Sequence, residues 1–319
     1  MAHRLAILKR HLEGANCASS TENFRYTVNN RFLTREQRQF YEKNGFVVIP
    51  RLVDPERLET YRDRFEQISM GFVKIDLMTV MRDVAYAKTN RDRSPITKLQ
   101  NFQDDAVLFD YCRLPSVLDY VSDFVGDDVM AMHTMLINKP PDPGTLSSRH
   151  PMHQDLHYFP FRPADRIVCS WTAMQRVHRD NGCLVVQPGS HQTVGRLLPH
   201  DYPKWEGGVN KMYHGVDYSP DMPRLHLEMN AGDTVLFHPL LIHGSGTNRT
   251  MGFRKAISCH YASSHCSYID VKGTTQEGIA KEAEGMAKKM LGFPISYTDT
   301  WKVRSRLVKG VEGSLSQSS

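Results

Sequence analysis

The sequence of 319 residues contains no run of eighteen apolar residues, so we expect no membrane span. Its six cysteines form no Cys-x-x-Cys pair and no zinc-type spacing, which predicts reduced thiols in an intracellular compartment rather than a disulfide framework. The basic residues form no long cluster, and a net charge of +5 is too mild for a dedicated nucleic-acid-binding protein. Mild positive charge would still suit an anionic substrate.

The first twelve residues differ from the rest because they contain basic and apolar side chains but no acid. Arg4-Leu5, followed after five residues by His11-Leu12, resembles the amino-terminal type of peroxisomal targeting signal. An amphipathic first helix and a mitochondrial presequence are the alternatives. We therefore predict a targeting and processing segment over residues 1–23, recognised by a peroxisomal import receptor, and one folded domain over residues 24–319. The predicted location is the peroxisomal matrix.

Helix and strand signals together predict an α+β domain. Thr34 and Gln37 form a capping box ahead of a helix over residues 35–44, which Gly45 ends. Asp54-Pro55 begins a second helix, and a third covers about residues 276–291. Short β-type runs separated by turn signals occupy residues 46–49, 129–138, 167–174, 183–187, 234–237 and 256–261. Many short strands of this kind favour an antiparallel jelly-roll with flanking helices.

A histidine-rich segment over residues 150–157 predicts a metal site. On a strand, residues two apart point to the same face, so His153 and Asp155 can converge on one ion. Two histidines and one carboxylate are typical of iron(II) oxygenases. His157 cannot be the third ligand on a straight strand, because four residues span about 13 Å.

The best candidate for the third ligand is His243, which we expect to end an apolar strand just before a Gly-Ser-Gly turn. His238 would lie on the other face of that strand. Eleven positions after His243, Arg254 opens a further strand, where its guanidinium could bind a carboxylate through two parallel hydrogen bonds. An ordinary surface arginine is the alternative. Arg249 is less suitable because it lies in a predicted exposed turn.

His153-Gln-Asp155, residues 171–191, residues 232–246 and Arg254 together resemble the phytanoyl-CoA dioxygenase family. The resemblance extends from about residue 24 to residue 309. It implies a double-stranded β-helix (jelly-roll) core and iron(II) bound by His153, Asp155 and His243. It also implies that 2-oxoglutarate is held by Arg254 and Ser245. The residues that it implies to line the 2-oxoglutarate pocket are Lys98, Met135 and Trp171.

The activity implied by the resemblance is 2-oxoglutarate-dependent hydroxylation of phytanoyl-CoA and other 3-methyl-branched acyl-CoAs at the 2-position, in peroxisomal fatty-acid α-oxidation. Dioxygen is then a cosubstrate, ascorbate (vitamin C) keeps the iron reduced, and no catalytic side chain beyond the metal ligands is expected. A 2-oxoglutarate-dependent hydroxylase of another substrate and a non-catalytic acyl-CoA-binding protein remain as alternatives. The candidate partners for the CoA phosphates are Arg149, Arg162, Lys204 and Lys211.

Overall fold

The computed structural model describes residues 23–29, 31–82, 95–142, 144, 148–205, 209–218 and 221–316. The predicted targeting segment lies outside these residues except for its last position. Among the helices of the described ranges, none has the length and apolar character needed to cross a membrane.

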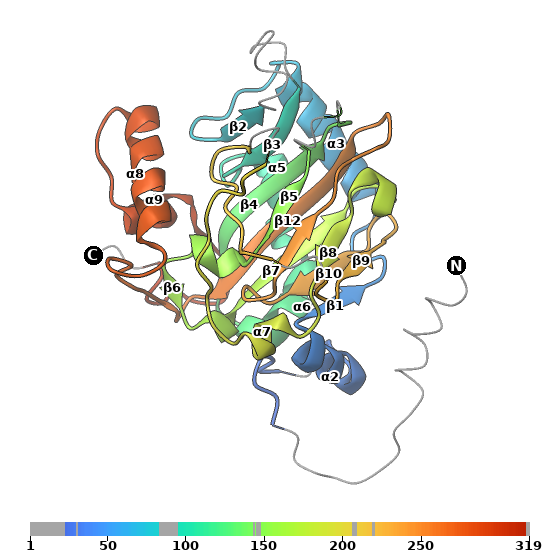
Figure 1. Cartoon of the computed structure of the whole chain (residues 1–319), viewed down its shortest axis with the longest axis vertical. Helices are drawn as coiled ribbons and strands as arrows, with labels where there is room; N and C mark the ends of the chain where they lie inside the picture. Colours follow the sequence, from blue (N-terminus) through green and yellow to red (C-terminus); the bar gives the residue numbers. More distant parts are fainter. Residues whose placement is uncertain are drawn as a thin grey trace.

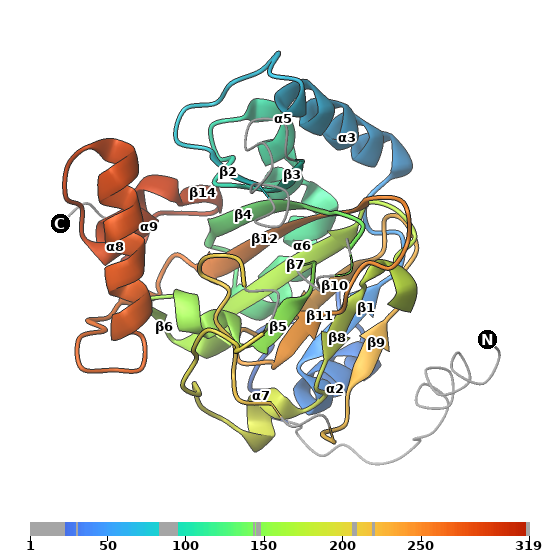
Figure 2. The same ribbon diagram turned by 45° about the horizontal axis from the view of Figure 1, so that its top comes forward.

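The fold is built on two antiparallel sheets (Figures 1 and 2). The larger sheet has the strand order β1 (Phe46–Ile49), β10 (Thr234–Phe237), β7 (Ile167–Ala173), β12 (Arg254–Ser263), β4 (Val129–Lys139), β3 (Ile96–Gln100) and β2 (Thr79–Arg82), with β14 (Arg306–Lys309) also paired to β4. The smaller sheet has the order β5 (His150–His153), β11 (His243–Ser245), β8 (Leu184–Val186) and β9 (Leu225–Leu227). Side chains from both sheets share one apolar core, including Trp171 and Phe237 from the larger sheet and Val186 from the smaller. This packing confirms the predicted jelly-roll.

Helices cover the outside of the larger sheet. α3 (Pro55–Ser69) and α6 (Pro115–Val125) bury Leu58 and Val121 against sheet residues such as Ile257. The short elements α5 (Ala106–Phe109) and η2 (Asp110–Arg113) lie between them along the chain, and α2 (Arg35–Asn44) packs near α7 (Ser190–Thr193). α8 (Glu277–Leu291) and α9 (Tyr297–Arg304) stand together on one flank of the molecule (Figure 1). The remaining short elements are η3 (Asp155–Tyr158), β6 (Phe161–Arg162), η4 (Ala164–Arg166), η5 (Arg179–Asn181) and β13 (Ser267–Tyr268).

Local sequence signals account for the helix boundaries. At the start of α2, the Gln37 backbone N–H donates to Thr34 Oγ1 at 3.2 Å, and the Thr34 N–H donates to Gln37 Oε1 at 2.9 Å. Gly45 ends the helix at φ 79°, a left-handed conformation that favours glycine. Asp54 occupies the position before α3 as predicted, although its side chain makes no capping hydrogen bond.

The described cysteines are unpaired, as their spacing predicts, and all of them are buried: Cys112, Cys169, Cys183, Cys259 and Cys266.

Candidate active site

Three short elements bring the predicted metal ligands together between the two sheets. β5 ends at His153, η3 begins at Asp155, and β11 begins at His243. β11 pairs with β5 in the register that sets His243 directly opposite His153. All three side chains are buried.

Two local predictions at this site are wrong. Asp155 does not continue the strand of His153, because the chain turns into η3, where the Leu156 N–H donates to Pro239 O at 3.0 Å. His243 does not end the preceding apolar strand, since β10 stops at Phe237 and a loop intervenes. The side chains nevertheless converge, because a turn and a strand pairing bring them to one point.

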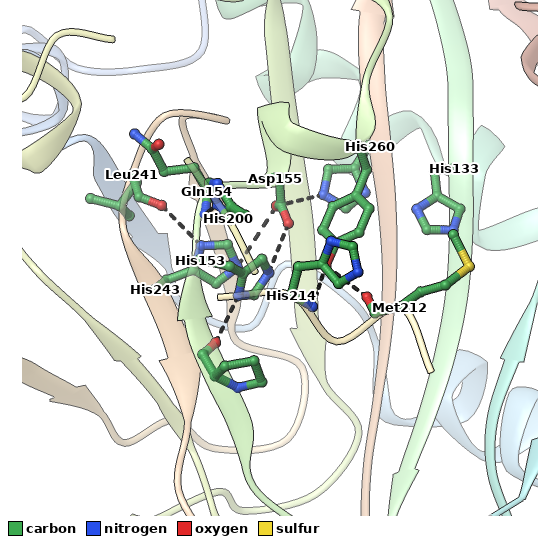
Figure 3. A network of polar contacts seen from close by, with 12 residues as sticks. His133, His153, Gln154, Asp155, His200, Met212, His214, Leu241, His243 and His260 are labelled. Carbon is green, nitrogen blue, oxygen red and sulfur yellow. Dashed lines mark hydrogen bonds and ion pairs between the residues drawn. The ribbon is translucent and has the colours of Figure 1, made fainter. Parts of the chain in front are cut away.

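The ligand atoms of His153, Asp155 and His243 all lie within 4.8 Å of one another (Figure 3). His153 Nε2 is 3.2 Å from Asp155 Oδ1, and His243 Nε2 is 3.7 Å from Asp155 Oδ2. One carboxylate therefore faces two imidazole nitrogens, which is the donor set of non-haem iron(II) oxygenases.

The protonation pattern of the two histidines fits metal binding. His153 Nδ1 lies 2.9 Å from Pro151 O, and His243 Nδ1 lies 3.0 Å from Leu241 O. A carbonyl oxygen only accepts hydrogen bonds, so each Nδ1 carries the proton and each Nε2 presents a lone pair. Burial also lowers the pKa of His243 to about 4, which keeps this imidazole neutral at physiological pH.

His260 of β12 is a functional candidate that the sequence analysis missed. Its Nε2 donates to Asp155 Oδ2 at 2.7 Å, from the side opposite His153 and His243 (Figure 3). Burial alone would raise the pKa of the Asp155 carboxyl, but the neighbouring His243 and His260 hold that pKa well below its usual value. Asp155 is thus an anion in the folded protein.

Asp155, Cys169 and His260 form a second group with metal-ligand spacing. Burial raises the pKa of the Cys169 thiol well above its usual value, which disfavours the thiolate that a metal would need. His260 Nε2 is already engaged with Asp155. His153, Asp155 and His243 are therefore the better candidate metal site.

We expect His260→Ala to weaken Fe(II) binding by about ten- to a hundredfold, because partners that orient a metal ligand typically contribute that much. Anaerobic titration of the apoprotein with Fe(II) measures the change. The control is His265→Ala, which removes an exposed histidine that contacts Asp128 instead. Equal iron affinity in both variants would show that His260 does not support Asp155.

A second part of the site centres on Arg254, the first residue of β12, which is only 2% exposed. Its Nη2 donates to Gly182 O at 2.8 Å, whereas its Nε and Nη1 have no hydrogen-bond partner among the described residues. Burial lowers the pKa of Arg254 to about 10, so the guanidinium remains charged at neutral pH. Two unpaired donors on a buried cation fit a carboxylate ligand.

Lys139 is the other residue here that the sequence analysis missed. It lies opposite Arg254 in the pairing of β12 with β4 and is 5% exposed. Its Nζ donates to Ser245 Oγ at 2.9 Å, to Gly246 O at 2.8 Å and to Ser148 O. Burial, followed by the charges of Arg254 and Lys98, holds the pKa of the Lys139 amine well below its usual value. Such a position favours an anionic ligand, which would reverse that shift.

One cavity of about 360 Å³ joins the two parts of the site, and all eight residues proposed from the sequence line it. Lys98 places its Nζ 4.7 Å from the centre of the Tyr213 ring. Met135 and Trp171 stand on either side of Ser258 in the strand register. The residues concerned are Lys98, Met135, His153, Asp155, Trp171, His243, Ser245 and Arg254.

The four basic residues considered for CoA separate into two groups. Arg149 and Lys211 line the cavity, and the Arg149 guanidinium lies 3.7 Å from the centre of the Trp205 ring. Lys204 does not line it. Arg162 is engaged elsewhere, because it donates to Gln276 Oε1 at 2.6 Å and to two backbone carbonyls.

Comparison with known proteins agrees with this geometry. Residues 41–256 match the family model described as phytanoyl-CoA dioxygenase (PhyH). The chain belongs to the phytanoyl-CoA dioxygenase family. Peroxisomal phytanoyl-CoA dioxygenase of Rattus norvegicus is 60% identical over 294 residues, covering 91% of this chain and 86% of that protein. Probable phytanoyl-CoA dioxygenase of Caenorhabditis elegans is 55% identical over 306 residues, covering 91% and 97%. The protein is accordingly an iron- and 2-oxoglutarate-dependent dioxygenase.

Solved structures share the fold at low sequence identity. A crystal structure of EctD from S. alaskensis with bound Fe has a TM-score of 0.59 and 15% identity, covering 78% of this chain and 85% of that chain. The carbocyclase SnoK from nogalamycin biosynthesis, described as non-heme and alpha ketoglutarate dependent, has a TM-score of 0.57 and 19% identity, covering 80% and 93%. The phytanoyl-CoA dioxygenase family thus shares its jelly-roll with these proteins.

Proposed function

We propose that the protein hydroxylates phytanoyl-CoA and other 3-methyl-branched acyl-CoAs at the 2-position, as a step of peroxisomal fatty-acid α-oxidation. The observation that carries the proposal is a single cavity that holds a buried His-Asp-His set at one place and the unpaired donors of Arg254 at another. Relatives 54–60% identical to this chain are named phytanoyl-CoA dioxygenase, which supports the choice of substrate.

His153, Asp155 and His243 would hold the iron. With 2-oxoglutarate bound, the iron centre would supply the dioxygen chemistry that hydroxylates the C–H bond at the 2-position while the cosubstrate becomes succinate and CO₂, and ascorbate would keep the iron reduced. The protein's own task is to hold both reactants in register and to keep Asp155 ionised. No side chain beyond the metal ligands is needed as an acid or base.

Arg254 would bind the far carboxylate of 2-oxoglutarate through its unpaired Nε and Nη1. Ser245 would share that carboxylate, and Lys139 would orient the Ser245 hydroxyl while adding a second positive charge. Lys98, Met135 and Trp171 would complete the pocket walls.

Arg149 and Lys211 would meet the anionic CoA, since both line the cavity. We therefore expect phytanoyl-CoA to be hydroxylated at least about tenfold more efficiently than free phytanic acid, because even one lost charge-assisted hydrogen bond costs about 1.5–3 kcal/mol. Turnover of the CoA ester should also fall as salt rises, since exposed charge contacts are screened. Succinate release and product mass measure both effects.

A panel of straight and branched acyl-CoAs extends this assay and separates the proposal from its nearest rival, a 2-oxoglutarate-dependent hydroxylase of another substrate. Equal turnover of acid and thioester, or no product from any branched acyl-CoA with iron-loaded protein, would contradict the proposed substrate. Uptake of acyl-CoA without any succinate release under the same conditions would instead indicate a non-catalytic binding protein.

The proposed location is the peroxisomal matrix, and relatives named peroxisomal support it. We propose that residues 1–23 act as the address and that residues 24–319 form the dioxygenase domain. An import receptor would recognise the Arg4-Leu5 and His11-Leu12 pattern.

Deleting residues 1–12 should leave the turnover of the purified enzyme unchanged, because the deleted residues precede the proposed dioxygenase domain. The shortened protein should stay in the cytosol, because it lacks the proposed import signal. Fluorescence microscopy of tagged chains measures the distribution. Adding Ser-Lys-Leu to the carboxyl terminus of the shortened chain should restore import through the other peroxisomal signal. Normal import of the shortened chain without that addition would rule out the address.

A further inference from the structure

α8 contributes an apolar stripe to the cavity that holds the metal ligands. The residues of the stripe are Ala283, Met286, Ala287 and Met290. Their spacing of three, four and seven residues puts them on one face of the helix. Every α8 residue that lines the cavity belongs to this stripe, so the wall that α8 provides carries no charge.

The stripe remains partly open to solvent. Met286 is 39% exposed and Met290 is 54% exposed, although both side chains also line the cavity. Methionine side chains are flexible and polarisable, which suits an irregular apolar ligand. A contiguous apolar surface that continues from a metal site towards solvent is typical of a binding groove.

The start of α8 is fixed to the segment that carries Asp155. Gln276, directly before the helix, is 2% exposed. Its Nε2 donates to Leu156 O at 3.0 Å, His157 O at 3.1 Å and Phe159 O at 3.0 Å. Because these carbonyls belong to η3 and its end, the helix and the metal ligand share one rigid frame.

A second attachment lies further along the helix. Glu282 Oε2 is 3.0 Å from His214 Nε2, and His214 Nδ1 is 3.0 Å from His157 Nε2. On the next helix, the Tyr297 N–H donates to Glu284 Oε1 at 2.8 Å. α8 is therefore held on two sides, and its apolar stripe is a preorganised wall rather than a loose segment.

We propose that the α8 stripe is the binding wall for the acyl chain of the substrate, and that the volumes of Met286 and Ala287 determine which chains are accepted. The inference rests on the proposed function and adds the residues that select the acyl group. An acyl chain fits this wall better than CoA does, because CoA is anionic and every basic residue that lines the cavity lies outside α8. The four stripe positions span about 10 Å along the helix.

The first test fills the groove. Ala287→Trp should weaken phytanoyl-CoA binding by at least about tenfold, because the indole occupies the space of several methylene groups. Affinities for free CoA and for 2-oxoglutarate should not change. Calorimetric titration of Mn(II)-loaded protein without oxygen measures all three. The control, Lys289→Trp, puts the same side chain on an exposed α8 position outside the cavity and should bind like the parent protein. Parental phytanoyl-CoA affinity in Ala287→Trp would overturn the inference.

The second test changes selectivity. Met286→Ala widens the groove and should favour branched phytanoyl-CoA over straight palmitoyl-CoA, whereas Met286→Phe should shift the ratio of affinities in the opposite direction. If both variants keep the parent protein's ratio of phytanoyl-CoA affinity to palmitoyl-CoA affinity, the stripe has no selective role. Because the two substitutions change volume in opposite directions, general destabilisation cannot produce opposite shifts.

Photolabelling separates this inference from the proposed function. Palmitoyl-CoA with a diazirine at the end of its chain should label residues 277–291, and phytanoyl-CoA should compete with it while free CoA does not. Labelling of α8 in a protein that does not hydroxylate phytanoyl-CoA would support the wall and contradict the proposed substrate. If the protein hydroxylates phytanoyl-CoA but the label appears on another segment, on a second copy of the chain or on a co-purified lipid, the proposed function is supported. The assignment of the α8 stripe as the acyl-chain wall is then wrong.

Discussion

Asp155→Ala is expected to abolish hydroxylation and to lower Fe(II) affinity by more than about a hundredfold. Asp155 is the only anion among the three proposed ligands, and its two carboxylate oxygens face His153 and His243 separately. Changes to residues that merely support a ligand typically cost ten- to a hundredfold in metal affinity, so loss of the ligand itself should cost more. Anaerobic iron titration and succinate release measure the two effects.

Two controls isolate the ligand role. Asp180→Ala removes an exposed carboxylate that pairs with Arg249 and should leave iron binding unchanged. His157→Ala removes the neighbouring histidine, which bonds to His214 rather than to the metal group, and should keep the iron stoichiometry. Full turnover of Asp155→Ala after addition of excess iron would show that the three-residue assignment is incorrect.

The parts of the fold that could be predicted are those specified by neighbouring residues in the sequence. Thr34, Gln37 and Gly45 define the ends of α2 by contacts within a few residues, and that helix forms as predicted. β1 and β10 occupy the predicted residues, and the other expected strands agree within a few positions. Runs of alternating or continuous apolar residues predict a strand because such a pattern is contained within a few neighbouring residues.

The details of the metal site could not be predicted at the same level. Whether the chain continues as a strand beyond His153 or turns into η3 depends on Pro239, which is distant in the sequence and accepts the Leu156 N–H. The ligand types and spacing led to the proposal of His153, Asp155 and His243, whose ligand atoms converge, but they did not describe the backbone that brings them together.

Residues that act through sheet register were missed for a related reason. His260 reaches Asp155 across 105 positions of the sequence, and Lys139 meets Arg254 only because β4 and β12 pair in one register. A single sequence gives no register between distant strands. Arg162 was expected to meet CoA because it lies close to the His153-Gln-Asp155 segment in the sequence. In the structure it donates to Gln276 instead, a contact that the sequence did not indicate.

Arg254→Lys is expected to weaken 2-oxoglutarate binding by about ten- to a hundredfold, which corresponds to the loss of a charge-assisted hydrogen bond worth about 1.5–3 kcal/mol. Arginine offers two parallel donors to a carboxylate, and Nε and Nη1 of Arg254 are the two that have no hydrogen-bond partner within the described part of the chain. Lysine keeps the charge but cannot make both contacts. Titration of Mn(II)-loaded protein with 2-oxoglutarate measures the affinity without requiring turnover.

The matched control is Arg304→Lys, which makes the same change at a partly buried arginine of the same cavity. Arg304 donates to Thr300 O at 2.7 Å and lies over the Trp301 ring, on the α9 wall. Its replacement should leave 2-oxoglutarate affinity unchanged. Lys139→Met should weaken that affinity as well, because it removes both the second charge and the donor that orients Ser245. If Arg254→Lys bound 2-oxoglutarate like the parent protein while Lys139→Met did not, the far carboxylate would belong to Lys139 and Ser245, and Arg254 would serve only to fix the loop at Gly182.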